Sequence, residues 1–96
     1  MIDRWNPEPY IEVVSNEYQL SVKQIKSKSR LKKINEARQF AMYLIQQNTA
    51  LTLSEIAKQF NRLDHTTVIN AVNRIQTKID NEPRFRELKN ILMARI

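Results

Sequence analysis

The sequence predicts an all-α protein, a compact bundle of about six helices that contains a helix-turn-helix. Apolar residues recur three or four positions apart in one segment after another, which is the spacing of helices that bury one face. No segment shows the alternation typical of a half-buried strand, and the chain has no glycine for tight hairpin turns. With 96 residues, we expect one domain over residues 1–96.

The first half of the chain predicts three helices. The first covers about 7–18, because proline suits a first turn and apolar residues follow at helical spacing. Ser21 is a suitable N-cap for a short helix over about 22–26. The stretch KSKSRLKKI is polar and basic and predicts a loop, after which Asn35 could cap a third helix that reaches about Gln47.

A fourth helix is predicted by a capping signal. Thr52 is followed three residues later by Glu55, which is the spacing of a capping box and starts a helix over about 53–60. Among residues other than glycine, asparagine adopts the left-handed conformation most readily, so Asn61 can close this helix. The helix is therefore expected to be short and to end in a tight turn.

The last two helices complete the predicted bundle. Asp64 is a second N-cap and opens a helix over about 65–79. Two helices joined by so short a turn have the layout of a helix-turn-helix. Pro83 opens the sixth helix, and its predicted inner face consists of Phe85, Leu88, Ile91 and Leu92.

Composition excludes several classes of site. The chain has no cysteine and a single histidine, which excludes disulfides, thiolate nucleophiles and multi-histidine metal sites. The lack of glycine argues against a phosphate-binding glycine loop, so we expect no nucleotide and no other cofactor. No apolar run approaches the roughly 18 residues of a membrane span, and the N-terminal stretch MIDRWNPEPY is unlike a signal peptide. We therefore expect a cytoplasmic protein with no membrane partner.

The positive charge of the chain is concentrated in one window. Residues 23–38 hold seven cations and one acid, Glu36, so this window carries a charge of +6, equal to the net charge of the whole chain. It could be a solvated basic loop. The alternative is a surface that binds a polyanion, most simply nucleic acid. A membrane surface fits less well, because the window is not amphipathic enough to lie in an interface.

The short stretch Asp64-His65-Thr66-Thr67 combines an acid, the only histidine and two hydroxyls. Neighbouring residues on a helix do not face one another, so these groups cannot form a catalytic relay, and we expect no enzymatic activity. In a first helical turn they would lie at the positive end of the helix dipole, where phosphates bind and short side chains can reach base edges. Ordinary helix capping by an exposed Asp remains the alternative.

The stretch LSEIAKQFNRLDHTTVINAVNRI closely resembles the signature of the C-terminal DNA-binding domain, domain IV, of the bacterial chromosomal replication initiator DnaA. The resemblance extends upstream through SKSRLKKINEARQFAMYLIQQ and is clearest over residues 10–96. It implies a Trp-repressor-like helix-turn-helix that binds double-stranded DNA at DnaA boxes, A/T-rich sites of the TTATNCACA type. The resemblance places four residues against bases or phosphates of the major groove: Asp64, His65, Thr66 and Thr67.

The same resemblance assigns the basic residues. Arg30 matches the arginine of the minor groove, where the negative potential of a narrow A/T groove attracts cations. The expected phosphate contacts are Lys28, Lys32, Lys33, Arg38 and Gln39.

The chain departs from the family at one point. The family usually has Gly-Gly-Arg before Asp-His, and here the residues are Asn61-Arg62-Leu63. Asn61 can still make the turn, but Leu63 replaces a cation beside the DNA. Arg62, one residue earlier, is a candidate to contact phosphate in its place. Box preference is therefore expected to differ from that of a standard initiator.

Three interpretations of function stay open at this stage. Without an ATPase, a free-standing domain would regulate or compete with replication initiation, or repress transcription, and the N-terminal sequence slightly favours a natural short protein. The chain could instead be excised from a full initiator. A third interpretation is a protein-interaction module that has lost DNA reading and docks a partner through Ile2, Trp5 and Tyr10, although these residues could equally cover the core.

Overall fold

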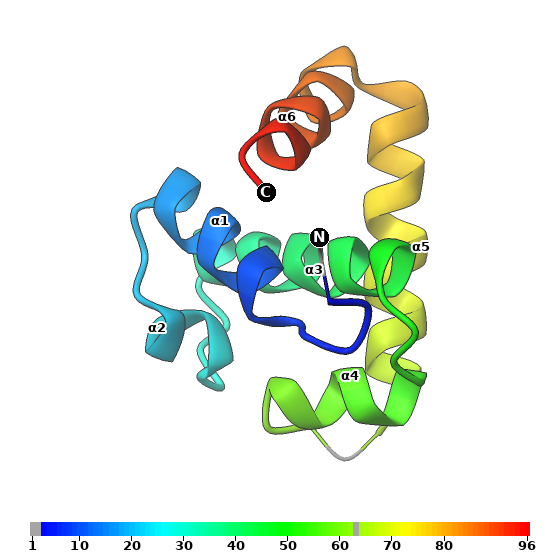
Figure 1. The fold of residues 1–96 in the computed structure, drawn as a ribbon. Coiled ribbons are helices and arrows are strands. Elements are labelled where there is room, and N and C mark those ends of the chain that lie inside the picture. Colours follow the sequence, from blue (N-terminus) through cyan, green and yellow to red (C-terminus); the bar gives the residue numbers. More distant parts are fainter. Residues whose placement is uncertain (1–2, 63) are drawn as a thin grey trace.

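The computed structural model describes residues 3–62 and 64–96, and every regular element in these two ranges is a helix (Figure 1). This confirms the predicted all-α fold. The described part of the chain contains no strand. In chain order the helices are α1 (Glu8–Tyr18), α2 (Val22–Lys26), α3 (Lys32–Asn48), α4 (Leu53–Gln59), α5 (Thr66–Asn81) and α6 (Pro83–Ala94).

Two of the predicted helix starts are confirmed in atomic detail. At α2 the hydroxyl of Ser21 accepts from the backbone N–H of Gln24 at 3.0 Å, and the Gln24 side chain accepts from the N–H of Ser21 at 2.8 Å. At α4 Thr52 and Glu55 make the same reciprocal pair at 3.1 and 2.9 Å. Each pair satisfies two N–H groups that a helix start leaves without partners, so both short helices have defined beginnings.

The start of α3 differs from the prediction. The helix begins at Lys32 rather than at Asn35, and its N-cap is Leu31, whose side chain makes no capping hydrogen bond. The backbone N–H of Asn35 already donates to the carbonyl of Leu31 at 2.8 Å, which places Asn35 inside the helix. The side chain of Ile34, in this extra turn, is buried, and burial of an apolar side chain favours the helix there. The predicted basic loop therefore ends earlier than expected.

The core surrounds α3, which runs through the middle of the bundle and packs against α1, α2, α4 and α5 (Figure 1). Phe40 stacks on Phe85 of α6 with ring centroids 6.2 Å apart, and it packs edge to face with Tyr43 with centroids 6.3 Å apart. The predicted inner face of α6 holds for Phe85 and Leu92, but Ile91 is exposed. Ile91 lies one position before Leu92, and a step of about 100° turns it away from the core.

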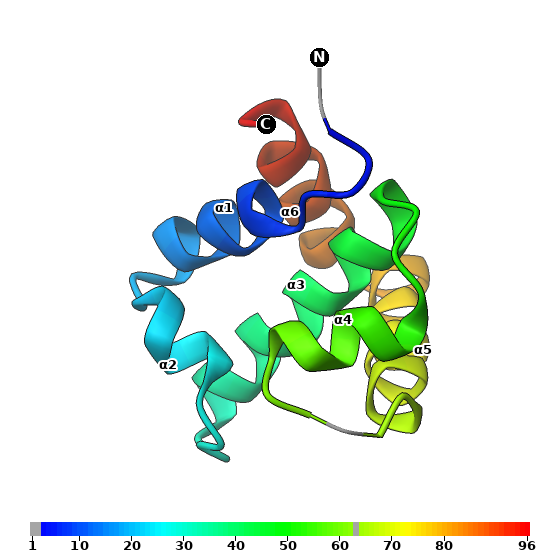
Figure 2. The same ribbon diagram turned by 60° about the horizontal axis from the view of Figure 1, so that its bottom comes forward.

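The helix-turn-helix is formed by α4 and α5, which pack against each other. Helix α4 lies at one end of the bundle in Figure 1, and this end comes forward in Figure 2. Asn61 has φ 58°, so it adopts the left-handed conformation predicted for the end of α4. Gln19, after α1, has φ 55° and fills the same role in a chain without glycine. The N–H groups of residues 61 and 62 return to the carbonyls of Lys58 and Ala57, which closes the turn compactly.

Two further observations concern membranes and metals. Among the described residues, no helix is long and apolar enough to cross a membrane. The same residues hold no group of three or more His, Cys, Asp or Glu side chains that could bind a metal ion.

Candidate nucleic-acid interface

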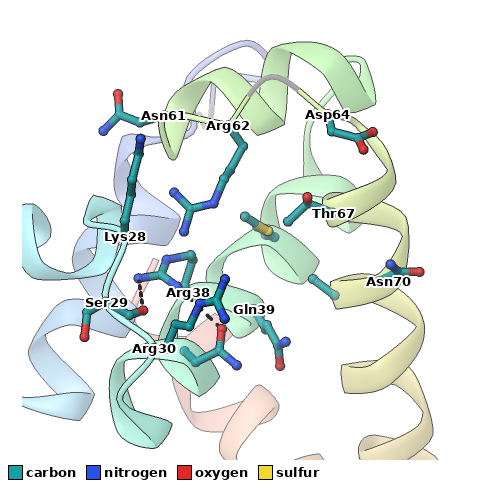
Figure 3. Close-up of a pocket in the computed structure, with 13 residues that line it drawn as sticks. Lys28, Ser29, Arg30, Arg38, Gln39, Asn61, Arg62, Asp64, Thr67 and Asn70 are labelled. Carbon is teal, nitrogen blue, oxygen red and sulfur yellow. Dashed lines mark hydrogen bonds between the residues drawn. The ribbon is translucent and has the colours of Figure 1, made fainter.

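A groove of about 610 Å³ lies between the loop after α2, the first turns of α3 and the front of α5 (Figure 3). Most of its lining side chains are cationic or carry an amide, and Met42 and Ala71 add apolar surface. The lining residues are Lys28, Ser29, Arg30, Asn35, Arg38, Gln39, Met42, Asn61, Arg62, Asp64, Thr67, Asn70 and Ala71. The groove thus joins segments that are about 40 residues apart in the chain.

The loop over residues 27–31, called the basic loop below, is held from within by its serines. The hydroxyl of Ser27 accepts from the backbone N–H of Ser29 at 3.2 Å, and that of Ser29 accepts from the N–H of Leu31 at 3.2 Å. Lys28 and Arg30 alternate with these serines, are exposed and line the groove. The pattern Ser-Lys-Ser-Arg therefore uses its serines to shape the backbone and presents its cations to the groove.

Arg38, on α3, is only 4% exposed, although it was predicted to contact phosphate. Its Nε donates to the carbonyl of Ile25 at 2.8 Å, and its Nη2 donates to that of Ser29 at 3.1 Å. A third donor, Nη1, reaches Asn35 Oδ1 at 3.5 Å. Burial lowers the pKa of the guanidinium, and the charge of Arg62 lowers it further. The described contacts give Arg38 a role in holding the basic loop, and its phosphate contact stays a prediction.

The turn of the helix-turn-helix also reaches the other side of the groove. Asn61 Nδ2 donates to the carbonyl of Lys26 at 3.2 Å. The Arg62 guanidinium forms two hydrogen bonds: Nη1 donates to the carbonyl of Phe60 at 2.8 Å, and Nη2 donates to that of Ser27 at 3.3 Å. Figure 3 shows Arg62 extending from the turn toward Arg38 across the groove. Leu63, the expected departure from the family pattern, lies outside the described residues.

The front of α5 is capped by Asp64, one residue away from the predicted arrangement. The helix begins at Thr66, with His65 in the N-cap position, and Asp64 Oδ1 accepts from the N–H of Thr66 at 2.8 Å. This hydrogen bond holds the pKa of the Asp64 carboxyl below its ordinary value. Asp64, His65 and Thr66 are exposed and Thr67 is half-buried, so this front is available to a ligand.

The structure gathers most, but not all, of the predicted site residues into the groove. Seven of them line it: Lys28, Arg30, Arg38, Gln39, Arg62, Asp64 and Thr67. His65 and Thr66 are exposed at the tip of α5, while Lys32 and Lys33 are exposed in the first turn of α3, outside the lining. Asn70 was missed by sequence reasoning, although it lies one helical turn beyond Thr67 on the same face.

The structure describes two of the three residues that are expected to dock a protein partner. Tyr10 is 1% exposed and belongs to the core, so its predicted contact with a protein partner is wrong and the alternative of core packing holds. Trp5 is 60% exposed, and Ile2 lies outside the described residues.

Comparison with known proteins agrees with this geometry. The family described as "Bacterial dnaA protein helix-turn-helix" matches residues 7–75, which include α1 to α4 and most of α5. The chain belongs to this family. The match confirms the resemblance seen in the sequence, and α4 and most of α5 lie within the residues that match this DNA-binding helix-turn-helix family.

Full-length relatives carry the name chromosomal replication initiator protein DnaA. The protein of Microcystis aeruginosa is 37% identical over 91 residues, which cover 95% of this chain and 20% of the relative. That of Aquifex aeolicus is 39% identical over 82 residues, covering 85% of this chain and 21% of the relative. That of Rickettsia canadensis is 35% identical over 80 residues, covering 83% and 17%. The chain thus spans about a fifth of the length of these DnaA proteins.

Proposed function

We propose that this chain binds double-stranded DNA at specific sites similar to DnaA boxes. The observation that carries the proposal is the groove itself. One wall presents the cations of the basic loop, and the other presents the capped front of α5. A helix front of this kind fits a major groove, while a cationic loop beside it can follow the adjacent strand into the minor groove.

The front of α5 would read bases. The Asp64 carboxylate can accept from cytosine N4, and the methyl groups of Thr66 and Thr67 can contact a thymine methyl. His65 is exposed beside them and can donate to a base edge or a phosphate. Asn70 adds an amide that can bond both N6 and N7 of adenine. Membership of the DnaA helix-turn-helix family supports this assignment.

The other wall would supply most of the affinity. We assign Arg30 to the minor groove, because its side chain is exposed at the end of a loop and a narrow A/T groove attracts arginine. Five cations and one amide are assigned to phosphates: Lys28, Lys32, Lys33, Arg38, Arg62 and Gln39. For Arg38 and Arg62 the assignment requires that donors beyond those already bonded to carbonyls reach the DNA.

We further propose that residues 1–96 act as one DNA-binding unit on the nucleoid in the cytoplasm. Acting alone, such a unit would compete with an initiator for its sites or repress transcription from them. As part of a longer initiator, it would deliver that protein to the same sites. No catalytic step is assigned to these residues.

Selection of bound duplexes from a random pool, followed by sequencing, tests the proposal. We expect enrichment of an asymmetric A/T-rich motif similar to a DnaA box. Titration of that motif against a scrambled duplex at two salt concentrations should then give different affinities with a steep salt dependence for both. Equal affinity for the motif and the scrambled duplex would overturn sequence-specific reading. No binding to any duplex at low salt would favour the interaction module instead.

A further inference from the structure

The basic loop is held from outside by three side chains that all end on its backbone or on the adjoining end of α2. Arg38 donates to the carbonyls of Ile25 and Ser29 from α3. Asn61 and Arg62 donate to the carbonyls of residues 26 and 27 from the turn of the helix-turn-helix. The two sides of the groove are therefore connected directly, and not only through the core.

We propose that Asn61 and Arg62 are positioning residues that set the basic loop relative to the front of α5, so that both reach one DNA site together. The proposal rests on the proposed function and adds a mechanism for its specificity. The pair Asn61 and Arg62 is called the loop clip below.

Arg62 suits this role because one rigid fork can bond two carbonyls at once. Its Nη1 donates to Phe60, at the end of α4, and its Nη2 donates to Ser27, in the basic loop. A guanidinium presents its N–H groups in a fixed plane, so the two bonds fix the separation of the two segments. Lysine, which is a flexible point charge, cannot impose such a separation.

Asn61 contributes through both its backbone and its side chain. The left-handed backbone conformation turns the chain from α4 toward α5, and the amide then reaches back to Lys26. Glycine would keep that backbone conformation without strain and remove only the amide contact. Asn61→Gly therefore isolates the side-chain contribution to the clip.

Holding the loop before DNA arrives would raise affinity by reducing the ordering cost of binding. A loop that these contacts did not hold would have to be fixed when it enters a groove, and fixing its backbone costs conformational entropy. The clip would thus favour DNA sites with one fixed spacing between the bases that α5 reads in the major groove and the segment that the basic loop enters in the minor groove.

The alternative is that Arg62 acts only as a phosphate contact. Its guanidinium has five N–H donors, so two bonds to carbonyls leave others for DNA. The two roles differ in what they couple: a phosphate contact acts independently of Arg30, whereas a positioning residue acts through the loop that carries Arg30.

The first measurement needs no DNA. Amide hydrogen exchange of residues 27–31 would be compared in the full chain for wild type, Asn61→Gly, Arg62→Ala and Lys58→Ala. Lys58 is an exposed cation of α4 outside the groove, so its variant matches the charge lost in Arg62→Ala. We expect faster exchange of the loop in the two clip variants and no change in the Lys58 variant. Unchanged exchange in both clip variants would overturn the proposal.

The second measurement uses the selected duplex. Arg62→Ala should weaken binding at least about tenfold in the wild-type background, the effect of ordering about one residue. The loss should be clearly smaller in an Arg30→Ala background, where only the phosphate contact of Arg62 can still be lost. Arg62→Lys should restore binding only in part, because it keeps the charge and loses the fork. Equal losses in both backgrounds, or full rescue by lysine, would overturn positioning in favour of a phosphate contact.

The two measurements separate the clip from the function on which it rests. If wild type bound no duplex while the clip variants still loosened the loop, the proposed function would fail, and with it the DNA role of the clip. Tight duplex binding with an unchanged loop would instead overturn the clip and leave the proposed function standing.

Discussion

Two helix starts border the groove, and they are built in opposite ways. At α3, Lys32 and Lys33 occupy the first turn and no side chain caps it. At α5, the Asp64 carboxylate accepts from the first N–H of the helix. Cations at the positive end of a helix dipole are locally unfavourable, whereas an acid there is favourable. The front of α3 therefore departs from local stability rules, and the front of α5 obeys them.

The difference indicates a division of labour. A helix start with two added cations attracts any polyanion, and its cost to folding is understandable if it supplies affinity. A helix start with a carboxylate repels phosphates, so the acid must contribute something other than affinity. Its ability to accept a hydrogen bond from a base makes it a candidate for discrimination. Affinity should thus come mainly from the α3 side of the groove and selectivity from the α5 side.

The largest effect is expected from removing the cations of α3. Lys32→Ala combined with Lys33→Ala should weaken binding about 30-fold at about 0.15 M salt, if each lysine neutralises one phosphate. The loss should be the same for the selected and the scrambled duplex, because phosphates carry no sequence. Titrations over a range of salt concentrations should show the slope reduced by about 1.8.

A matched control exists at α6, whose first turn also carries two cations. No residue of α6 lines the groove, whereas α3 lines it through Asn35, Arg38 and Gln39. Arg84→Ala combined with Arg86→Ala removes the same charge, and we expect only a small change in affinity. The unfolding temperature of the lysine variant should not fall, since the lysines are exposed and oppose the dipole. If the double lysine variant lost more affinity for the selected duplex than for the scrambled one, the α3 side of the groove would contribute to selectivity as well.

Removing a short side chain from the front of α5 should give the second largest effect. Thr66→Ala is expected to reduce discrimination between selected and scrambled duplexes about tenfold, or about 1.4 kcal/mol, within the range for one base contact. The cap is kept in Thr66→Ala, because Asp64 Oδ1 accepts from the backbone N–H of this residue, which alanine retains. Thr77→Ala, on the far part of α5, is the control. If both variants discriminate like wild type, Thr66 reads no base.

A smaller change should follow from neutralising Asp64. Asparagine can still cap α5, so Asp64→Asn should unfold like wild type. Affinity for the scrambled duplex should rise about threefold, the effect of removing one charge about 6 Å from a phosphate in water. Discrimination should fall at the same time. Measurements on Asp64→Ala, which also loses the cap and should unfold at a lower temperature, separate the two roles. A lower affinity of Asp64→Asn for scrambled DNA would contradict the comparison.

The smallest effect concerns acid. Because the bond from Thr66 lowers the pKa of Asp64, this carboxylate stabilises the fold fully above its unfolded-state pKa of about 3.9. That contribution is lost as the pH falls through the lower folded-state pKa. Urea unfolding should therefore show that the free energy of unfolding falls more between pH 7 and pH 3 for wild type than for Asp64→Asn. Lys32→Ala should lose as much unfolding free energy between pH 7 and pH 3 as wild type. An equal loss in all three proteins would show that the Asp64 cap does not contribute to stability.

The sequence predicted those parts of the fold that short-range patterns determine. The residue type of Ser21 predicts a cap, and Thr52 is predicted as one from Glu55 three positions later; both capping bonds are present. The left-handed turn at Asn61 was predicted for the same local reason. The early start of α3 carries no such signal, because Leu31 cannot cap and the two lysines oppose the dipole.

The sequence indicates many of the residues that line the groove, but not the contacts of its arginines. Arg38 and Arg62 have the composition and placement of phosphate contacts, and both line the groove. Their bonds to the carbonyls of Ile25 and Ser27 join residues 13 and 35 positions apart in the chain. Such bonds depend on how α2, α3 and α4 pack, and a carbonyl acceptor is present at every residue. No pattern of side chains could therefore have identified them.

The backbone of the basic loop is held in place without the side chains that the loop presents to the groove. Its backbone is held by its own serines and by donors that end on carbonyl oxygens, which every residue possesses. Neither Lys28 nor Arg30 uses its side chain to hold another described residue in place. Mutation or design could therefore replace the two side chains without rebuilding their support. The backbone of the loop is held independently of the two side chains that it presents. Substitutions at these two positions could therefore change the preferred DNA site without a loss of fold stability.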